Sequence, residues 1–296
     1  MSQLSYPYRT IDNKHVKISA ELIATVDSQG YSLESFSAGA RDTVWLLLRS
    51  NRNSPSWRLL CVSQKAQWEL HLECGGESFS FLQPLPGGFL LAESRQDGFD
   101  PNAFTYDQSG KPIRSFCIGD GVQSVQTTTA GDIWVSYFDQ GTLGNTIARA
   151  GLLCFNADGE PIYTFQPVVG LDRILDCYAL NVENDDTAWI YYYSPFPIVR
   201  IHKRLIDGVW KAPIPYATAF AVYRDTVVMD NGVQQDGWTR LTLQDNGRVS
   251  RSGPVVFLDD EGAPFSAKFA TARGRLIWFL KDAKIYCADL GHLRFL

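Results

Sequence analysis

The sequence predicts an all-β fold of the β-propeller type: a closed ring of six blades, each a four-stranded antiparallel sheet. Two observations predict it, a weak internal repeat and a composition that suits half-buried strands. Hydrophobic residues make up 45% of the 296 residues and aromatic residues 13%, whereas methionine occurs only twice. Aromatic residues favour strands. All-β domains of this size are common, so we expect a single domain over residues 1–296.

The clearest repeat joins two segments, residues 86–118 and 127–168. In both, a glycine-containing turn precedes an apolar strand, a long polar loop follows, and a second strand leads through a tight turn into a third. The runs DQSGKPIRSF (107–116) and NADGEPIYTF (156–165) align residue for residue. Glycine, Asn and Asp accept the positive φ angles that tight hairpin turns require. The two segments therefore predict neighbouring blades.

Less regular copies of the pattern occur on both sides of these segments. Aligning the centre of each second strand gives a series whose spacing is that of four-stranded blades: Trp45, Phe89, Trp134, Trp189, Val228 and Trp278. The last copy holds about three strands after Phe265, one fewer than a blade needs. The N-terminal run HVKISAELIATV (15–26) can supply the missing outer strand and close the ring, which removes exposed strand edges. We expect almost no helix, and seven blades are the alternative if residues 1–36 form more than this strand.

Segments 86–118 and 130–166 resemble blades of NHL-type propellers. In that family a glycine precedes an apolar strand, an irregular polar loop follows, and the next strand runs into a turn of the Asp-x-x-Gly type. The matching residues are Gly88–Leu91 with Asp107–Gly110, and Gly131–Val135 with Asn156–Gly159. The resemblance covers two blades and implies an architecture often used for binding, although a fold does not dictate a function.

The charge and the cysteine content of the chain argue against several classes of protein, including nucleic-acid-binding and zinc-binding proteins. The formal net charge is −5 and the basic residues are scattered, so we expect no nucleic-acid surface, which needs clustered Lys and Arg. The N-terminal segment lacks the basic start and apolar core of a signal peptide, and no run approaches the length of a membrane span. The six cysteines lack CxxC or zinc-like spacing. We therefore expect a cytoplasmic protein with free thiols.

The predicted loops differ in length, and this asymmetry is the main functional signal. In each blade the loop between the second and third strands lies on the same face as the connection to the next blade. We call this the long-loop face, and the opposite face, which carries the other turns, the short-turn face. Long irregular loops on a rigid scaffold favour binding. The candidate binding residues, loop by loop, are Arg49; Glu93, Arg95 and Asp97; Asp139, Asn145 and Arg149; Tyr192; and Asp230, Gln234, Asp236 and Trp238.

No catalytic constellation is evident, since none of the four histidines has a partner at metal-ligand spacing. We therefore expect a non-catalytic propeller without a cofactor that binds a macromolecule, in the first place a protein, through the long-loop face. Its specific form is an immunity protein that neutralises a basic partner, which the mild negative charge suits. The alternative is a metal-dependent hydrolase or lactonase, in which Glu93, Asp97, Asp139 and Asp230 converge on the channel and bind Ca²⁺ or another divalent metal.

A structural role without a ligand is a further reading of these loops. The third loop, residues 138–145, combines two glycines with Asp139 and Asn145, whose side chains can bond the local backbone. The sequence leaves a structural or sensor module open beside the binding protein.

Overall fold

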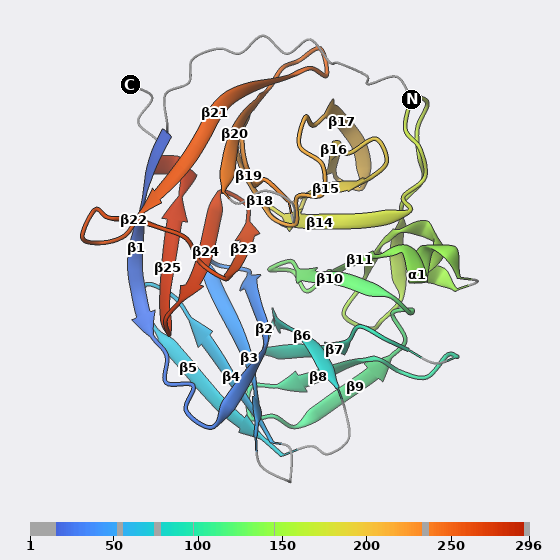
Figure 1. Ribbon diagram of the computed structural model, residues 1–296. Helices are drawn as coiled ribbons and strands as arrows, with labels where there is room; N and C mark the ends of the chain where they lie inside the picture. Colours follow the sequence, from blue (N-terminus) through green and yellow to red (C-terminus); the bar gives the residue numbers. More distant parts are fainter. Residues whose placement is uncertain are drawn as a thin grey trace.

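The computed structural model describes residues 16–51, 56–73, 78–96, 98–144, 146–232 and 237–292. Strands dominate these residues and form small sheets around a common centre (Figure 1). Four sheets hold four antiparallel strands each, in sequence order. Their strands are β2 (Tyr31–Gly39), β3 (Thr43–Ser50), β4 (Trp57–Val62) and β5 (Gln67–Leu72); β6 (Phe79–Leu85), β7 (Gly88–Glu93), β8 (Ala103–Asp107) and β9 (Pro112–Phe116); β10 (Val122–Thr127), β11 (Ile133–Tyr137), β12 (Leu152–Phe155) and β13 (Pro161–Thr164); and β14 (Asp176–Val182), β15 (Thr187–Tyr193), β16 (Pro197–His202) and β17 (Leu205–Lys211).

The other described strands form one nine-stranded sheet in the order β18-β19-β20-β21-β1-β25-β24-β23, with β22 paired to β21. Their bounds are β18 (Phe220–Tyr223), β19 (Thr226–Asp230), β20 (Trp238–Leu243), β21 (Val249–Leu258), β22 (Pro264–Phe265), β23 (Phe269–Arg273), β24 (Leu276–Lys281), β25 (Lys284–Asp289) and β1 (Val16–Thr25). Figure 1 shows β2, β6, β10, β14, β18 and β23 nearest the centre. This nearly closed all-β ring is consistent with the predicted β-propeller.

The core lies between successive sheets, so the inner strands are buried on both faces. All five residues of β11 are buried, as are the first six of β15. Trp134 of β11, for example, packs in one cluster with Ile190 and Val199 of the next sheet. The predicted strand centres all fall in strands of this kind, which confirms the repeat: Trp45 in β3, Phe89 in β7, Trp134 in β11, Trp189 in β15, Val228 in β19 and Trp278 in β24.

The aligned turns of the repeat share one hydrogen-bond pattern. Asp107 Oδ1 accepts from the backbone N–H groups two and four residues later, at 2.8 and 3.0 Å. Asn156 Oδ1 does the same at 3.0 and 2.9 Å, and Asp259 Oδ1 forms a third copy. Each turn ends on a glycine with positive φ, including Gly110 and Gly159. The sequence echo is thus a repeated Asx turn.

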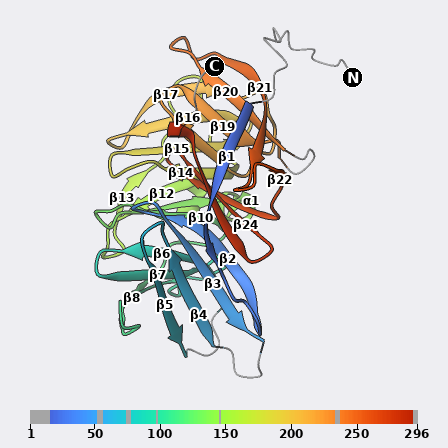
Figure 2. The ribbon, with the colours of Figure 1, turned by 90° about the vertical axis from the view of Figure 1, so that its left-hand side faces the viewer.

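Strand β1 joins the two ends of the ring. Ala20–Thr25 pair antiparallel with β25, which confirms the prediction that this segment supplies an outer strand. Val16–Ser19 also pair in parallel with β21, an interaction that the repeat did not predict. Figure 2 shows β1 running between β21 and the C-terminal strands. One strand therefore covers the edges of two neighbouring strand groups.

A buried amide lies among the innermost strands. Gln126 of β10, which is 4% exposed, donates through Nε2 to the carbonyls of Leu180 (3.1 Å) and Ala272 (3.0 Å). Its Oε1 accepts from the Val182 N–H at 2.7 Å. A single side chain therefore bonds backbone groups of β14 and β23 that in-sheet pairing does not reach.

Two more amides extend this arrangement into a layer that we call the amide layer: Gln83, Gln126 and Asn181. Gln83 and Asn181 are fully buried. Their side chains bond the backbone of Ala38 and Thr127, and of Phe220 and Gly274, respectively. The amide layer thereby connects β2, β6, β10, β14, β18 and β23, the strands nearest the centre.

Helix is scarce in the described part of the chain, as expected, but it occurs in the third loop. That loop forms α1 (Asp139–Leu143) and the 3₁₀ turn η1 (Ile147–Ala150), and a second 3₁₀ turn, η2, spans Leu290–His292. A Cβ atom on Gly141 would lie 2.3 Å from the Asp120 carbonyl oxygen. The glycine is therefore needed for a close backbone approach, in addition to any turn preference. No described helix is long and apolar enough to cross a membrane.

Candidate functional site

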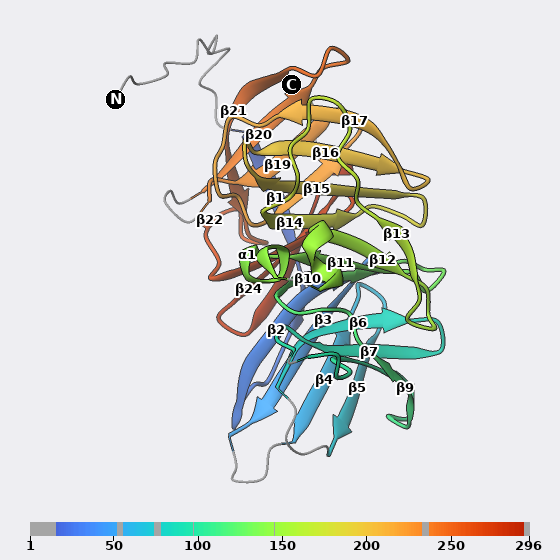
Figure 3. The same ribbon diagram turned by 90° about the vertical axis from the view of Figure 1, so that its right-hand side faces the viewer.

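The second-to-third-strand loops lie at one end of the strands, on the long-loop face. The loop between β11 and β12, which contains α1, is the longest of them, and in Figure 3 its helix α1 lies near the middle of the view and faces the reader. The fourth such loop is short, because only Ser194–Phe196 connect β15 with β16. Tyr192 therefore lies within β15 and not on a loop. Its side chain is fully buried, and its hydroxyl donates to the Asp172 carbonyl at 3.0 Å.

Arg95 connects the second and third loops. Its Nε donates to Asp120 Oδ1 at 3.0 Å, and its Nη1 donates to Gln140 Oε1 of α1. Asp120 Oδ1 also accepts from the Gln96 N–H at 3.0 Å. These bonds fix the two loops relative to each other, so the face has a defined shape at this point.

Two of the predicted carboxylates, Glu93 and Asp230, accept hydrogen bonds from nearby backbone N–H groups. Glu93 Oε1 accepts from the Ser78 N–H at 2.9 Å. Asp230 accepts from the N–H groups of Thr218, Ala219 and Gly232 at 2.8 to 3.0 Å. Across the described ranges, no group of three or more His, Cys, Asp or Glu side chains is placed to hold a metal.

Asp139 lies near a second carboxylate, Asp176, at the start of β14. Burial raises the pKa of Asp176, and the charge of Asp139 raises it further. Burial also raises the pKa of the neighbouring Tyr178 to about 12, with the charge of Asp176 as the next cause. Within the described ranges neither carboxylate forms an ion pair. The pair is thus a negative site without a cation.

Aromatic rings surround Phe196 beside this pair. Phe196 packs edge-on against Tyr193 (centroids 5.5 Å apart) and Tyr216 (5.1 Å), and it also contacts Tyr178 (6.0 Å). Tyr193 is 40% exposed. The φ angles of Phe196 and Tyr216 are 65° and 62°, a left-handed conformation that is uncommon for bulky residues and concentrates at binding sites.

The other candidates lie apart from one another. Arg49 is exposed, with Cζ 5.8 Å from the Trp57 ring centroid, and Arg149 is exposed on η1. Trp238 is half-buried against Phe257 and Phe279. Asp97, Asn145, Gln234 and Asp236 fall outside the described residues.

Exposed apolar side chains on the long-loop face were missed by the sequence reasoning, which weighed only polar loop residues. Phe99 is 86% exposed and Leu143 is 66% exposed. Other exposed members are Ile147, Val168, Val169 and Tyr193. The hydroxyl of Thr142 donates to the Leu175 carbonyl, which joins α1 to the connection between β13 and β14. The detectable signal was an apolar residue inside a polar loop sequence, as in Asp-Gly-Phe99-Asp.

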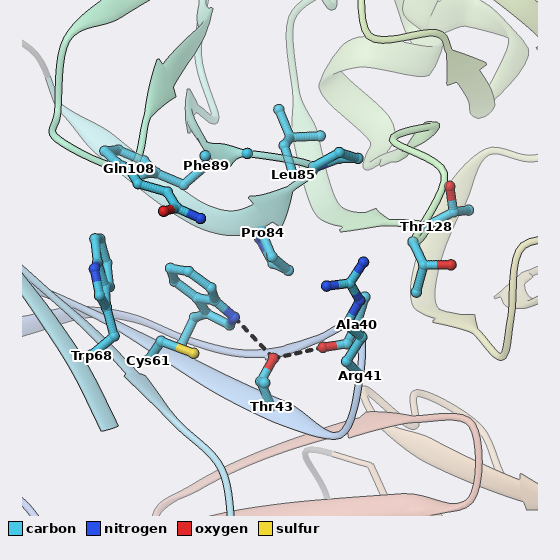
Figure 4. Close-up of a pocket in the computed structure, with 15 residues that line it drawn as sticks. Ala40, Arg41, Thr43, Cys61, Trp68, Pro84, Leu85, Phe89, Gln108 and Thr128 are labelled. Atoms are coloured by element: carbon cyan, nitrogen blue, oxygen red, sulfur yellow. Dashed lines mark hydrogen bonds between the residues drawn. The ribbon is translucent and has the colours of Figure 1, made fainter. Parts of the chain in front are cut away.

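The short-turn face carries a cleft that the sequence did not predict. It has a volume of about 470 Å³ and lies between the sheets β2–β5 and β6–β9. Figure 4 shows Trp68 and Gln108 at one end of this cleft, and Arg41 at the end nearest Thr128. The residues that line the cleft come from strands and turns far apart in the sequence, so no local sequence pattern predicts it.

A model of the YxzG family matches residues 152–288, which is less than half of the chain. No curated protein matches the sequence. The chain is similar in structure to a chain of the mitotic checkpoint complex, at 9% identity and a TM-score of 0.51, with 98% of each chain covered.

It is likewise similar to virginiamycin B lyase from Staphylococcus aureus, at 12% identity and a TM-score of 0.51, covering 89% of this chain and 96% of that one. A further similar structure is the β-propeller domain of the Trilobed protease from Pyrococcus furiosus, at 9% identity and a TM-score of 0.48, covering 87% and 82%. At these identities the likeness concerns the fold alone. The described strands and this likeness are consistent with the β-propeller fold that the repeat predicts, and the finer NHL-type likeness stays a prediction.

Proposed function

We propose that this chain is a non-catalytic binding propeller that engages a protein partner through its long-loop face. The main support for this proposal is that several exposed apolar side chains lie on that face: Phe99, Leu143, Ile147, Val168, Val169 and Tyr193. Apolar groups that gather on one face of a protein favour a protein interface, because burying them in a complex removes them from water.

The charge of the face suggests which partner it fits. Burial and the negative charge of Asp139 both raise the pKa of Asp176, which lies beside the Tyr178 ring. A Lys or Arg side chain of a partner would relieve that repulsion and could also lie over a tyrosine ring. A basic protein is therefore the preferred partner, and neutralisation of a basic toxin is the specific form of the proposal.

We further infer a single six-bladed domain. In this interpretation the nine-stranded sheet contains two blades, β18–β21 and β23–β25 with β1 as the outer strand of the second. Its support is that each of the aligned strand centres, Trp45 to Trp278, would then belong to one blade.

The binding proposal is tested by affinity capture from native cell lysate, with the captured proteins quantified by mass spectrometry. Leu143 and Leu205 form a matched pair, because both are highly exposed, at 66% and 71%. Leu143 lies in α1 on the long-loop face, whereas Leu205 begins β17 at the turn after β16, on the short-turn face.

Wild type and Leu205→Asp are expected to capture the same protein in near-stoichiometric amount, and Leu143→Asp is expected to lose it. Equal capture by the two variants would contradict the proposed face. Recovery of no stoichiometric partner by wild type would contradict the binding function.

A further inference from the structure

A cavity lies where the two ends of the ring meet. It has a volume of about 430 Å³, within the range of ligand pockets, and its lining comes from β2 and β3 on one side and from β23 and β24 on the other. The β24–β25 turn and the connection between β1 and β2 also line it. In the six-bladed interpretation both segments lie on the long-loop face. The cavity is separate from the proposed partner surface, whose apolar side chains lie between Phe99 and Tyr193 in the sequence.

Aliphatic side chains form most of the apolar lining. Val26, Leu46 and Leu48 are buried, and they also belong to the core cluster between these strands. Leu33 and Leu280 are only half-buried, so part of their surface is open to an occupant of the cavity. The hydrophobic effect has no directional preference, so a flexible aliphatic chain can fill a space with walls of this kind.

Phe269 extends the apolar wall to the solvent. It begins β23, and 38% of its surface is exposed. The Lys268 ammonium lies 5.2 Å from the centroid of the Phe269 ring, and Lys268 is exposed and also lines the cavity. Ser28 and Ser266 line it as well, and a serine hydroxyl can donate to a carboxylate. The cavity therefore passes from aliphatic side chains through an exposed ring to a cation and hydroxyl groups.

The charges around the cavity favour a ligand with one negative charge. Two lysines and one carboxylate line it: Lys268, Lys281 and Asp282. A further lysine, Lys284, lies directly opposite Lys281 across the turn, where like charges repel. Among the described residues none of these lysines forms an ion pair. The Lys281 ammonium lies over the Phe265 ring, 5.6 Å from its centroid, so Lys268 is the cation left to pair with a ligand.

We propose that this cavity binds an aliphatic monocarboxylate of medium chain length. The chain of the ligand lies against Leu33, Leu280 and Phe269, and its carboxylate pairs with Lys268 at the solvent side. The proposal goes beyond the proposed function and does not rest on it, because the site is complete within a single chain.

Isothermal titration calorimetry with octanoate tests the proposal. Octanamide keeps the aliphatic chain without the charge, and butyrate keeps the charge on a shorter chain. We expect one octanoate per chain and roughly threefold weaker binding of octanamide, because an ion pair with an exposed lysine is weak. Butyrate should bind at least roughly tenfold more weakly than octanoate, because it buries fewer CH₂ groups.

Variants assign the site to the chain. Ser266 is exposed and lines the cavity, so Ser266→Trp is expected to fill the cavity with its indole and to abolish saturable octanoate binding. Lys268→Gln is expected to weaken octanoate binding by roughly threefold and to leave octanamide binding unchanged. Lys65→Gln and Leu205→Asp, both exposed on the short-turn face, are the matched controls and should bind octanoate as wild type does. Circular dichroism checks that each variant is folded.

Three results would overturn the proposal: no saturable binding of octanoate at millimolar concentration, unchanged octanoate binding by Ser266→Trp, or equal affinity for octanoate and butyrate. Equal affinity for octanoate and octanamide, or unchanged octanoate binding by Lys268→Gln, would refute the pairing with Lys268 and with it the proposed ligand class.

Discussion

Replacing Gln126 by leucine removes a side chain that forms three hydrogen bonds in the amide layer. The substitution keeps nearly the same volume, but it deletes two donated bonds and one accepted bond. Each buried hydrogen bond contributes about 1 kcal/mol net, and a buried group left without a partner costs about 1–3 kcal/mol. We therefore expect Gln126→Leu to lower the free energy of unfolding by about 3–5 kcal/mol, since the Leu180 and Ala272 carbonyls and the Val182 N–H lose their partner.

The assay is urea denaturation followed by tryptophan fluorescence, with the free energy extrapolated to water. Gln123→Leu is the matched control, because Gln123 lies in the same strand with its side chain exposed, and its effect should stay within about 0.5 kcal/mol. A loss below about 1 kcal/mol for Gln126→Leu, or one equal to that of the control, would refute the view that the amide layer holds the inner strands together.

Three further outcomes follow from the site geometry. Asp176→Asn should stabilise the free protein at neutral pH, because burial and the charge of Asp139 raise the pKa of Asp176 and make its charged form unfavourable. Thermal melts at several pH values should show this gain in stability disappear below about pH 4, the pKa of the carboxyl in the unfolded chain, because the wild-type carboxyl is then protonated in both states. Asp230→Ala should destabilise by about 2 kcal/mol by chemical denaturation, because a carboxylate accepting from Thr218, Ala219 and Gly232 N–H groups forms charge-assisted bonds; Asp230→Asn, which keeps an acceptor, should lose less. EDTA should leave the melting temperature unchanged, whereas a lower value together with stoichiometric metal by elemental analysis would favour the hydrolase alternative.

The strands and turns were predictable because their determinants are local. Apolar runs centred on Trp134 or Trp278 are long enough to mark strands, and Asp107 and Asn156 organise their turns through bonds to residues two and four positions later. The pairing of the N-terminal strand with β25 could be predicted because the last copy of the repeat has one strand too few. The parallel pairing with β21 could not be predicted in this way, because it depends on how two strand groups meet in space.

The functional surfaces were less predictable because their residues meet only in the folded ring. Tyr192 follows a strand sequence and precedes a proline, which suggests a loop, yet the connection is so short that the residue stays in the buried strand. Gln126 and Arg273 look like ordinary polar residues in sequence, and only the convergence of inner strands makes them buried. The cleft draws Trp45, Trp68 and Phe89 from two different sheets.

Strand β1 has a consequence for the order of events during synthesis. The strands that pair with it, β21 and β25, lie near the other end of the sequence, so it leaves the ribosome long before them. Until they follow, its backbone donors and acceptors are an open edge that another chain can pair with. The alternation of its exposed residues helps to limit this danger, because Lys17, Ser19 and Glu21 interrupt the apolar positions. The polar residues of β1 therefore protect the strand that closes the ring from pairing with other chains until β21 and β25 have been synthesised.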